Sequence, residues 1–200
     1  MADIHYLDNP LETEELLELL CPPVRNWFKD KFPDFTDPQK LAIPAIMDQE
    51  HLLLCSPTGS GKTLTAFLTI IDQLVRRALD NKLDKRVYCV YISPIKALAN
   101  DIQRNLIGPL TEISETYLPS RAQEIRVGLR TGDTPQSERQ KMLRNPPHIL
   151  ITTPESLAIA ITSPRFQPIV SEVEYMIVDE LHSLVPTKRG VHLALTLSYL

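Results

Sequence analysis

Two closely spaced glycines followed by a lysine and a threonine are the first residues in this chain whose pattern predicts chemistry. The segment reads Ser56-Pro57-Thr58-Gly59-Ser60-Gly61-Lys62-Thr63, and the apolar run 52–54 precedes it. Between a strand and a helix, such a turn presents backbone N–H groups to phosphate oxygens. Lys62 can then reach the terminal phosphates of a nucleotide, and the hydroxyl of Thr63 can hold Mg²⁺.

The alternative for this segment is an ordinary turn with a solvated lysine. Ser56 also stands where the usual phosphate-loop motif has its first glycine. The remaining positions all match the motif, and a helical pattern follows, so we predict a site for a nucleoside triphosphate. The predicted binding residues of the loop are Thr58, Gly59, Ser60, Gly61, Lys62 and Thr63.

An acidic pair provides the other half of the expected chemistry. The apolar run 175–178 is typical of a strand, and Asp179 and Glu180 follow it directly. An aspartate at a strand end can hold Mg²⁺ through its water shell, and the next glutamate can orient and deprotonate the attacking water. We therefore predict Asp179 as a Mg²⁺ ligand together with Thr63, and Lys62, Asp179 and Glu180 as the catalytic residues.

Two further polar residues are candidates for the nucleotide site. Gln39 follows Thr36, Asp37 and Pro38, a sequence that is typical of a helix start. Its amide offers one donor and one acceptor, which the edge of adenine requires. His182 lies two residues after Glu180 and is either a hydrogen-bonded loop histidine or a link between the ATP site and neighbouring loops.

The elements that must position these residues alternate between strand and helix. After the phosphate loop, a helix is predicted from apolar residues at Leu64, Phe67, Leu68, Ile71, Leu74, Val75 and Ala78. The predicted strands are 52–54, 86–92, 125–129, 148–152 and 175–178. This alternation indicates an α/β fold with a largely parallel sheet flanked by helices. Ligands bind such sheets just past the carboxyl ends of the strands, where the polar clusters lie.

Residues before the phosphate loop are predicted to be helical. A short acidic helix is expected over 11–20, and a second helix begins at Pro22-Pro23 with Val24, Trp27 and Phe28 on one face. We expect 1–33 to be a helical lead-in and 34–200 to be one nucleotide-binding domain.

Composition favours a soluble, cytoplasmic protein of one domain. No apolar run reaches the length of a membrane span, and the acidic N-terminus does not have the form of a signal peptide. Cys55, directly after the apolar run 52–54, and Cys89, in the predicted strand 86–92, are expected to be buried free thiols, while a zinc site is improbable. The net charge of −4 requires any nucleic-acid contact to be local.

The order of these motifs resembles the first motor domain of superfamily-two helicases, and more closely that of the large helicase-related (Lhr) family. The stretches that carry the closer resemblance are Trp27-Phe28, 93–101, 130–135 and 188–195. The resemblance implies a RecA-like domain that binds ATP and Mg²⁺, with Gln39 reading adenine and an aromatic residue near Phe32 or Phe35 stacking on the base.

The resemblance also implies translocation along single-stranded nucleic acid, with DNA favoured over RNA, unwinding in the 3′-to-5′ direction and a link to DNA repair. Three loops would then contact the strand without reading its sequence, through backbone N–H groups, hydroxyls and a few basic side chains. Their candidate residues are Pro94, Lys96, Arg130, Thr131, Gly132, Thr153, Pro154 and Glu155.

The chain ends at Leu200, shortly after the acidic pair, and no Ser-Ala-Thr motif, second motor domain or arginine finger follows. We therefore expect the 200 residues alone to lack unwinding activity, with a second RecA-like domain of the parent chain as partner. Two other functions are weighed: a nucleotide-dependent switch whose loops bind a protein, and a small-molecule kinase. The kinase would not need the Thr-Pro-Glu and Arg-Thr-Gly loops.

Overall fold

The computed structural model describes residues 4–57, 59–94 and 99–199. The chain divides into two compact units, which are described separately. Unit 1 comprises Met1–Asp80 and Asp101–Ala122, and unit 2 comprises Asn81–Asn100 and Gln123–Leu200. The division passes through the short helix α5 (Ala99–Ile102).

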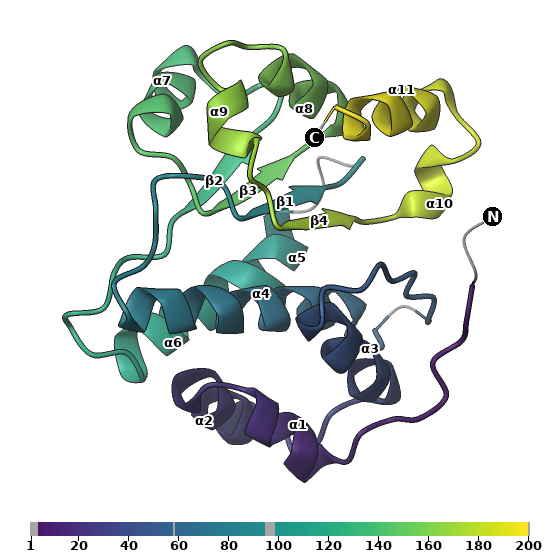
Figure 1. The fold of residues 1–200 in the computed structure, drawn as a ribbon, viewed down its shortest axis with the longest axis vertical. Helices are drawn as coiled ribbons and strands as arrows, with labels where there is room; N and C mark the ends of the chain where they lie inside the picture. The colour runs from purple at the N-terminus through teal and green to yellow at the C-terminus, as the bar shows by residue number, and fades with distance from the viewer. Residues whose placement is uncertain (1–3, 58, 95–98, 200) are drawn as a thin grey trace. The chain divides into compact units, whose positions relative to one another are not determined.

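Unit 1 is helical throughout its described regular structure (Figure 1). The long helix α4 carries the seven apolar residues predicted for its inner face, and all of them are buried. Helices α2 and α3 and the π-helical turn η2 pack against α4. The elements of unit 1 are α1 (Thr13–Leu19), α2 (Pro22–Lys31), α3 (Asp37–Met47), α4 (Lys62–Leu79), η2 (Gln103–Ile107) and α6 (Gly108–Thr116).

The predicted strand at 52–54 is wrong. Residues 51–57 form no regular structure, Leu53 is 71% exposed, and Cys55 is exposed rather than buried. A strand needs a neighbour for its backbone hydrogen bonds, and the described residues of unit 1 contain no strand with which this run could pair. Cys89, by contrast, is fully buried as expected.

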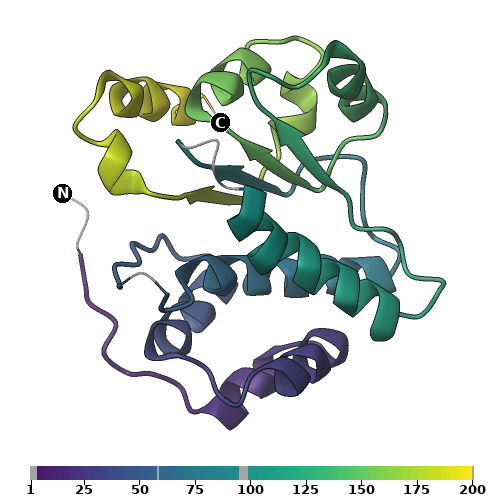
Figure 2. The ribbon, with the colours of Figure 1, turned by 180° about the vertical axis from the view of Figure 1, so that it is seen from behind.

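Unit 2 is built on a parallel sheet with the strand order β2-β3-β1-β4. Helices α7, α8, α9 and α11 lie along one face of this sheet (Figures 1 and 2). The core beneath them is apolar and includes Val90, Leu150, Leu157 and Phe166. The elements are β1 (Cys89–Ile92), β2 (Val127–Arg130), α7 (Gln136–Arg144), β3 (Ile149–Thr152), α8 (Pro154–Ile161), α9 (Gln167–Val170), β4 (Tyr175–Val178), α10 (Leu181–Leu184) and α11 (Lys188–Leu197).

The sequence-based prediction of a parallel α/β fold is confirmed in unit 2, where β1 to β4 match the four later predicted strands. The parallel register places the ends of neighbouring strands together, since Ile92 pairs with both Thr152 and Val178. The segments that begin after β1, β3 and β4 therefore start at one edge of the sheet. No helix in the described part of the chain combines the length and apolar character that a membrane crossing needs.

A buried histidine at the start of β3 makes the stability of unit 2 depend on pH. The ring Nδ1 of His148 accepts a hydrogen bond from the backbone N–H of Arg126 at 3.1 Å. Burial, followed by the nearby Arg126 charge, lowers the pKa of His148 from 6.5 to about 4. The unfolded chain therefore binds a proton more readily than the folded chain between these values, so stability is fully present above pH 6.5 and is lost as pH falls towards 4.

We expect the free energy of unfolding to fall by about 2 kcal/mol between pH 7 and pH 5 from this residue alone. Denaturant titration at both pH values would measure the change. A His148→Gln variant keeps a hydrogen-bonding side chain but cannot titrate, so its loss over the same interval should be smaller by that amount. An equal loss in both proteins would contradict the assignment to His148.

Candidate nucleotide and nucleic-acid site

The phosphate loop of unit 1 owes its shape to its two glycines. Gly59 and Gly61 have φ angles of +82° and +85°, in the left-handed region that disfavours other residues. Gly61 is the residue that precedes the first turn of α4. The hydroxyls of Ser56 and Ser60 lie 2.6 Å apart across the loop. The predicted binding residue Thr58 lies outside the described residues.

Lys62 folds back over this loop. Its ammonium group donates hydrogen bonds to the carbonyl of Ser56 and, at 2.7 Å, to that of Pro57. The positive charge therefore lies beside the turn, where the first backbone N–H groups of α4 also begin. Thr63 follows in the first helical turn and is partly buried. This arrangement can hold an anion, as the sequence predicted for a phosphate group.

The start of helix α3 contacts the same loop. Thr36 donates a hydrogen bond from its hydroxyl to the carbonyl of Ser60 at 2.9 Å, and the side-chain oxygen of Gln39 accepts from the backbone N–H of Thr36 at 2.9 Å. Gln39 is only 3% exposed. Its amide nitrogen lies 2.9 Å from the place where a Cβ atom on Gly61 would stand. The structure thus brings Gln39 to the phosphate loop, while its contact with adenine stays a prediction.

The two loop glycines offer a matched pair of substitutions. Gly59→Ala should lower stability by about 1–2 kcal/mol, because alanine is strained in the left-handed region but meets no described atom within 4 Å. Gly61→Ala should cost more, because the same strain is joined by a clash with Gln39. Thermal unfolding of the two variants measures the difference, and equal melting temperatures would show that Gln39 does not constrain the loop.

Of the aromatic residues considered for base stacking, Phe35 belongs to the helical core and Phe32 lies at its edge. Phe35 is 4% exposed and stacks on Phe28 with ring centroids 3.9 Å apart. Phe32 is 37% exposed and packs against both Phe28 and Trp27. Phe32 therefore keeps more exposed ring surface than Phe35 for a base.

In unit 2, Asp179 lies at the end of β4 with both carboxylate oxygens hydrogen-bonded. The hydroxyl of Tyr91, from the neighbouring strand β1, donates to one oxygen, and the backbone N–H of Glu180 donates to the other at 2.9 Å. The backbone N–H of Asp179 donates to the carbonyl of Ile92 at 2.9 Å. The carboxylate is therefore oriented by groups from two strands. Tyr91 was not among the predicted site residues, because in the sequence it is one more residue of an apolar strand.

Glu180 adopts an unusual backbone conformation for a glutamate. Its φ angle is +51°, and it immediately precedes α10. Its carbonyl accepts hydrogen bonds from both the backbone N–H and the hydroxyl of Ser183 at 2.8 Å, which holds the turn. The Nε2 atom of His182 lies 3.2 Å from its carboxylate. Strained, non-glycine conformations of this kind concentrate at functional sites.

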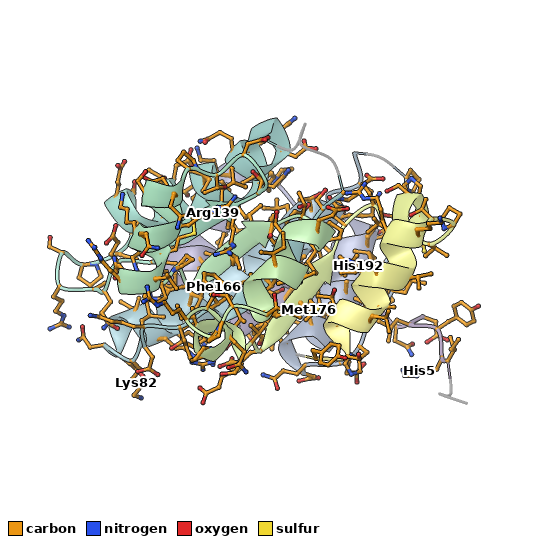
Figure 3. The ribbon with its side chains drawn as sticks, turned by 90° about the horizontal axis from the view of Figure 1, so that it is seen from above. His5, Lys82, Arg139, Phe166, Met176 and His192 are labelled. Atoms are coloured by element: carbon orange, nitrogen blue, oxygen red, sulfur yellow. The ribbon has the colours of Figure 1, made fainter. Side chains whose placement is uncertain are left out.

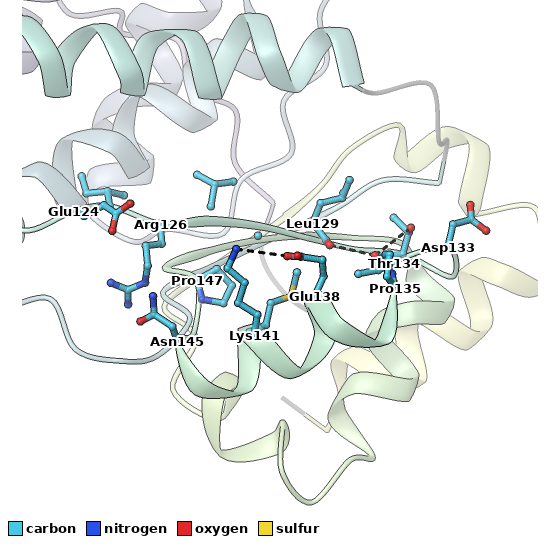
Figure 4. A pocket seen from close by; sticks show the side chains of 15 residues that line it. Glu124, Arg126, Leu129, Asp133, Thr134, Pro135, Glu138, Lys141, Asn145 and Pro147 are labelled. Atoms are coloured by element: carbon cyan, nitrogen blue, oxygen red, sulfur yellow. Dashed lines mark hydrogen bonds and ion pairs between the residues drawn. The ribbon is translucent and has the colours of Figure 1, made fainter.

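The loop that follows β2 is held by a residue that the sequence analysis did not select. Arg139 of α7 donates hydrogen bonds to the carbonyls of Thr131, Gly132 and Thr134, at 3.3, 3.0 and 2.9 Å. Thr134 adds a hydroxyl bond to the carbonyl of Leu129 at 3.2 Å (Figure 4). The loop is therefore held by two side chains that follow it in the chain, those of Thr134 and Arg139.

Arg130 does not project from this loop. It is 7% exposed, and its guanidinium group lies 4.4 Å from the ring centroid of Phe166. Phe166 and Arg139 are labelled in Figure 3. Burial, together with the neighbouring Arg139 charge, lowers the pKa of Arg130. Because the guanidinium group packs on Phe166, the groups of this loop that remain for a phosphate are the hydroxyl of Thr131 and the backbone of Thr131 and Gly132.

The third predicted loop begins α8 as expected. Thr153 caps the helix by accepting a hydrogen bond from the backbone N–H of Ser156 at 3.4 Å, and Pro154 occupies its first turn. Glu155 forms an ion pair with Arg189 of α11. Pro94 is described and its carbonyl also contacts Arg189, whereas Lys96 lies outside the described residues.

A cavity of about 810 Å³ lies elsewhere in unit 2, between β2 and α7 (Figure 4). Of the predicted site residues that the structure describes, only Thr131 lines it. Its walls are mixed in character, with the ion pair of Lys141 and Glu138 on α7 facing Leu129 of the edge strand. The cavity thus reaches the loop after β2 at Thr131 but is separate from the ends of β1, β3 and β4.

Comparison with known proteins defines the class to which this fold and these motifs belong. A family model described as DEAD/DEAH box helicase matches residues 36–200. The chain therefore belongs to the DEAD/DEAH box helicase family. Its sheet and flanking helices are those of a RecA-like domain, as expected.

The resemblance to the Lhr helicases is confirmed as well. The chain is 51% identical to the ATP-dependent helicase Lhr-Core of Methanocaldococcus jannaschii, over 100% of this chain and 24% of that protein. It is 45% identical to the Lhr helicase/uracil glycosylase of Escherichia coli, over 96% of this chain and 13% of that protein. The structure of Mycobacterium smegmatis helicase Lhr bound to ssDNA and AMP-PNP matches with a TM-score of 0.80 and 43% identity, over 92% of this chain and 23% of that one. The chain thus spans about a quarter or less of these relatives.

Proposed function

We propose that this chain is the first RecA-like motor domain of an ATP-dependent helicase, which hydrolyses ATP to move along single-stranded nucleic acid. The observation that carries the proposal is the position of Lys62, held over a left-handed glycine turn at the start of α4. Membership of the DEAD/DEAH box helicase family supports the choice of a motor over other nucleotide-binding proteins. The motor domain proper is assigned to 34–200, with 1–33 as a helical lead-in.

Each unit is assigned its own part of the ATP reaction. In unit 1, the loop residues Thr58 to Thr63 bind the phosphates and Gln39 reads adenine. In unit 2, Asp179 is the metal-binding carboxylate and Glu180 takes a proton from the attacking water. His182 is assigned to the rim of the site, next to Glu180.

The residues assigned to Mg²⁺ fit this ion. Mg²⁺ prefers oxygen ligands and keeps several waters, so the hydroxyl of Thr63 in unit 1 and the carboxylate of Asp179 in unit 2 are each of a kind that this ion accepts. Hydrogen bonds from Tyr91 and Glu180 fix the direction of the Asp179 carboxylate. Bound Mg²⁺ supplies neutralisation of the phosphate charge.

The nucleic-acid strand is assigned to the segments that follow β1, β2 and β3. Their candidate residues offer hydroxyls, backbone N–H groups and one lysine, which contact a backbone without specifying sequence. DNA is favoured over RNA as the track, and movement along it is assigned the 3′-to-5′ direction. The parent protein is assigned to DNA repair in the cytoplasm. A second RecA-like domain in the parent chain is the expected partner. The assigned residues are Pro94, Lys96, Thr131, Gly132, Thr153, Pro154 and Glu155, together with the backbone of Arg130, whose guanidinium group is buried over Phe166.

ATP turnover by the natural chain that contains these residues tests the proposal. It should be measured without nucleic acid and with single-stranded DNA or RNA of the same length and sequence. Strong stimulation would support a nucleic-acid motor, and the better activator would identify the nucleic acid along which it moves. If neither DNA nor RNA changed ATP turnover, a nucleotide-dependent switch whose loops bind a protein would be favoured instead. The 200 residues alone are expected to unwind no duplex.

A further inference from the structure

We propose that Arg189 is a positioning residue that fixes two nucleic-acid-binding segments of unit 2 relative to each other. The proposal rests on the proposed function, because it concerns the surface assigned to the strand. Arg189 donates from Nε to Oε1 of Glu155 at 2.5 Å and from Nη2 to Oε2 at 3.2 Å. The same Nη2 atom donates to the carbonyl of Pro94 at 3.2 Å. One guanidinium group thus bridges the segment after β1 and the first turn of α8.

The packing of α11 determines where this guanidinium group lies. Gly190 follows Arg189, and a Cβ atom at Gly190 would overlap the carbonyl of Leu184 in α10. The backbone N–H of Thr187 also donates to the Leu184 carbonyl, at 2.9 Å. Further along α11, Leu193 is buried in the core that includes Leu157 of α8. Arg189 is therefore presented from a helix that is held against both α10 and α8.

The chemistry of the bridge requires an arginine. A guanidinium group has donors in a rigid, planar fork, so it can bind both oxygens of a carboxylate and a further acceptor at once. A lysine ammonium group carries the same charge on one flexible atom and cannot reproduce this geometry. The ion pair lowers the pKa of Glu155 and raises that of Arg189, so both groups stay charged throughout the neutral range.

The bridge has two consequences for a bound strand. Pro94 and Glu155 follow the paired strands β1 and β3, so fixing them sets the spacing between two contacts on the same backbone. Arg189 also neutralises the charge of Glu155, which would otherwise repel a nearby phosphate. Because backbone and hydroxyl contacts depend on precise placement, a loss of this spacing should weaken strand binding.

Three variants of the natural chain test the positioning role. Arg189→Ala should raise the single-stranded DNA concentration for half-maximal ATP turnover about fivefold, while turnover at saturating DNA changes little. Arg189→Lys should produce most of the same increase even though net charge is unchanged. The control is Lys188→Ala, which removes the same charge from the neighbouring exposed position and should behave like the wild type. Thermal unfolding of each variant confirms that the fold is retained.

A double-mutant cycle with Glu155→Gln tests whether Arg189 affects strand binding through Glu155. If the two residues act as one bridge, the double variant should be no weaker than Arg189→Ala alone. The salt dependence of binding should keep its slope in Arg189→Ala, since removing a cation that contacts phosphate directly would reduce that slope by about one. Additive losses or a reduced slope would make Arg189 a direct strand contact and overturn the positioning role.

The outcomes separate this inference from the function on which it rests. If single-stranded DNA and RNA do not change wild-type ATP turnover, the proposed function fails and the positioning role fails with it. If wild-type turnover responds to the strand but Arg189→Lys matches the wild type, only the positioning role is overturned.

Discussion

Replacing Lys62 with alanine is expected to lower nucleic-acid-stimulated ATP turnover at least about 100-fold, while the fold remains intact. The large effect on turnover follows from removing a positive charge aimed at the phosphates, the kind of group worth about 10²–10³ in rate. The small effect on stability follows from the loop itself. Lys62 bonds the carbonyls of Ser56 and Pro57, and these lie at a part-exposed surface where water can replace it, at a cost of about 1 kcal/mol.

Parallel measurements of turnover and of thermal unfolding separate the two effects. The matched control is Lys85→Ala, which removes one positive charge from an exposed position of the other unit and should leave turnover unchanged. If Lys62→Ala and Lys85→Ala were equally active, the glycine turn would not be a phosphate site. If Lys62→Ala were inactive because it had unfolded, the melting temperature would reveal it, and Lys62→Gln would then replace it as the test.

The strands of unit 2 were predictable because local sequence determines them. Strands β1, β3 and β4 are mostly apolar runs, and β3 has a clear boundary in the Pro146-Pro147 pair before it. The run 52–54 has the same local character, yet it forms no strand and Leu53 is largely exposed. Three apolar residues cannot by themselves indicate whether a pairing strand is present, because that partner comes from elsewhere in the chain.

Candidate site residues could be selected from the sequence where they belong to a short motif, as Lys62 and Asp179 do. They could not be selected where one residue acts on another far along the chain. Tyr91 bonds Asp179 across 88 residues, and Arg189 bonds Glu155 across 34. Neither pair has a sequence pattern, because only the register of the sheet and the packing of helices bring them together.

Arg130 is a second case in which local sequence could not indicate the surroundings of a side chain. A basic residue in a polar loop after a strand is reasonably assigned to a phosphate, and that assignment depends on its side chain being exposed. The structure instead buries the guanidinium group over Phe166. Phe166 precedes α9, and nothing in the segment around Arg130 indicates that an aromatic ring from there would cover it.

Glu180→Gln is expected to lower ATP turnover by about 10²–10⁴-fold while ATP binding is retained, because an amide cannot accept the proton of the attacking water. The change should not disturb the local structure. The left-handed turn at Glu180 is held through its backbone carbonyl, which bonds Ser183, and glutamine keeps that group. The contact with His182 is altered, but His182 is 81% exposed, so little stability depends on it.

Retained binding combined with lost turnover is the result that identifies a general base. Binding of a fluorescent ATP analogue and release of phosphate should therefore be measured on the same preparation, with Glu115→Gln on α6 as an exposed control. Comparison with Asp179→Asn sharpens the assignment. That substitution changes the acceptor for Tyr91 and the proposed metal ligand together, so it should weaken Mg²⁺-dependent nucleotide binding as well as turnover. If Glu180→Gln weakened binding to the same extent as Asp179→Asn, Glu180 would belong with the binding groups, and the base would have to be sought elsewhere.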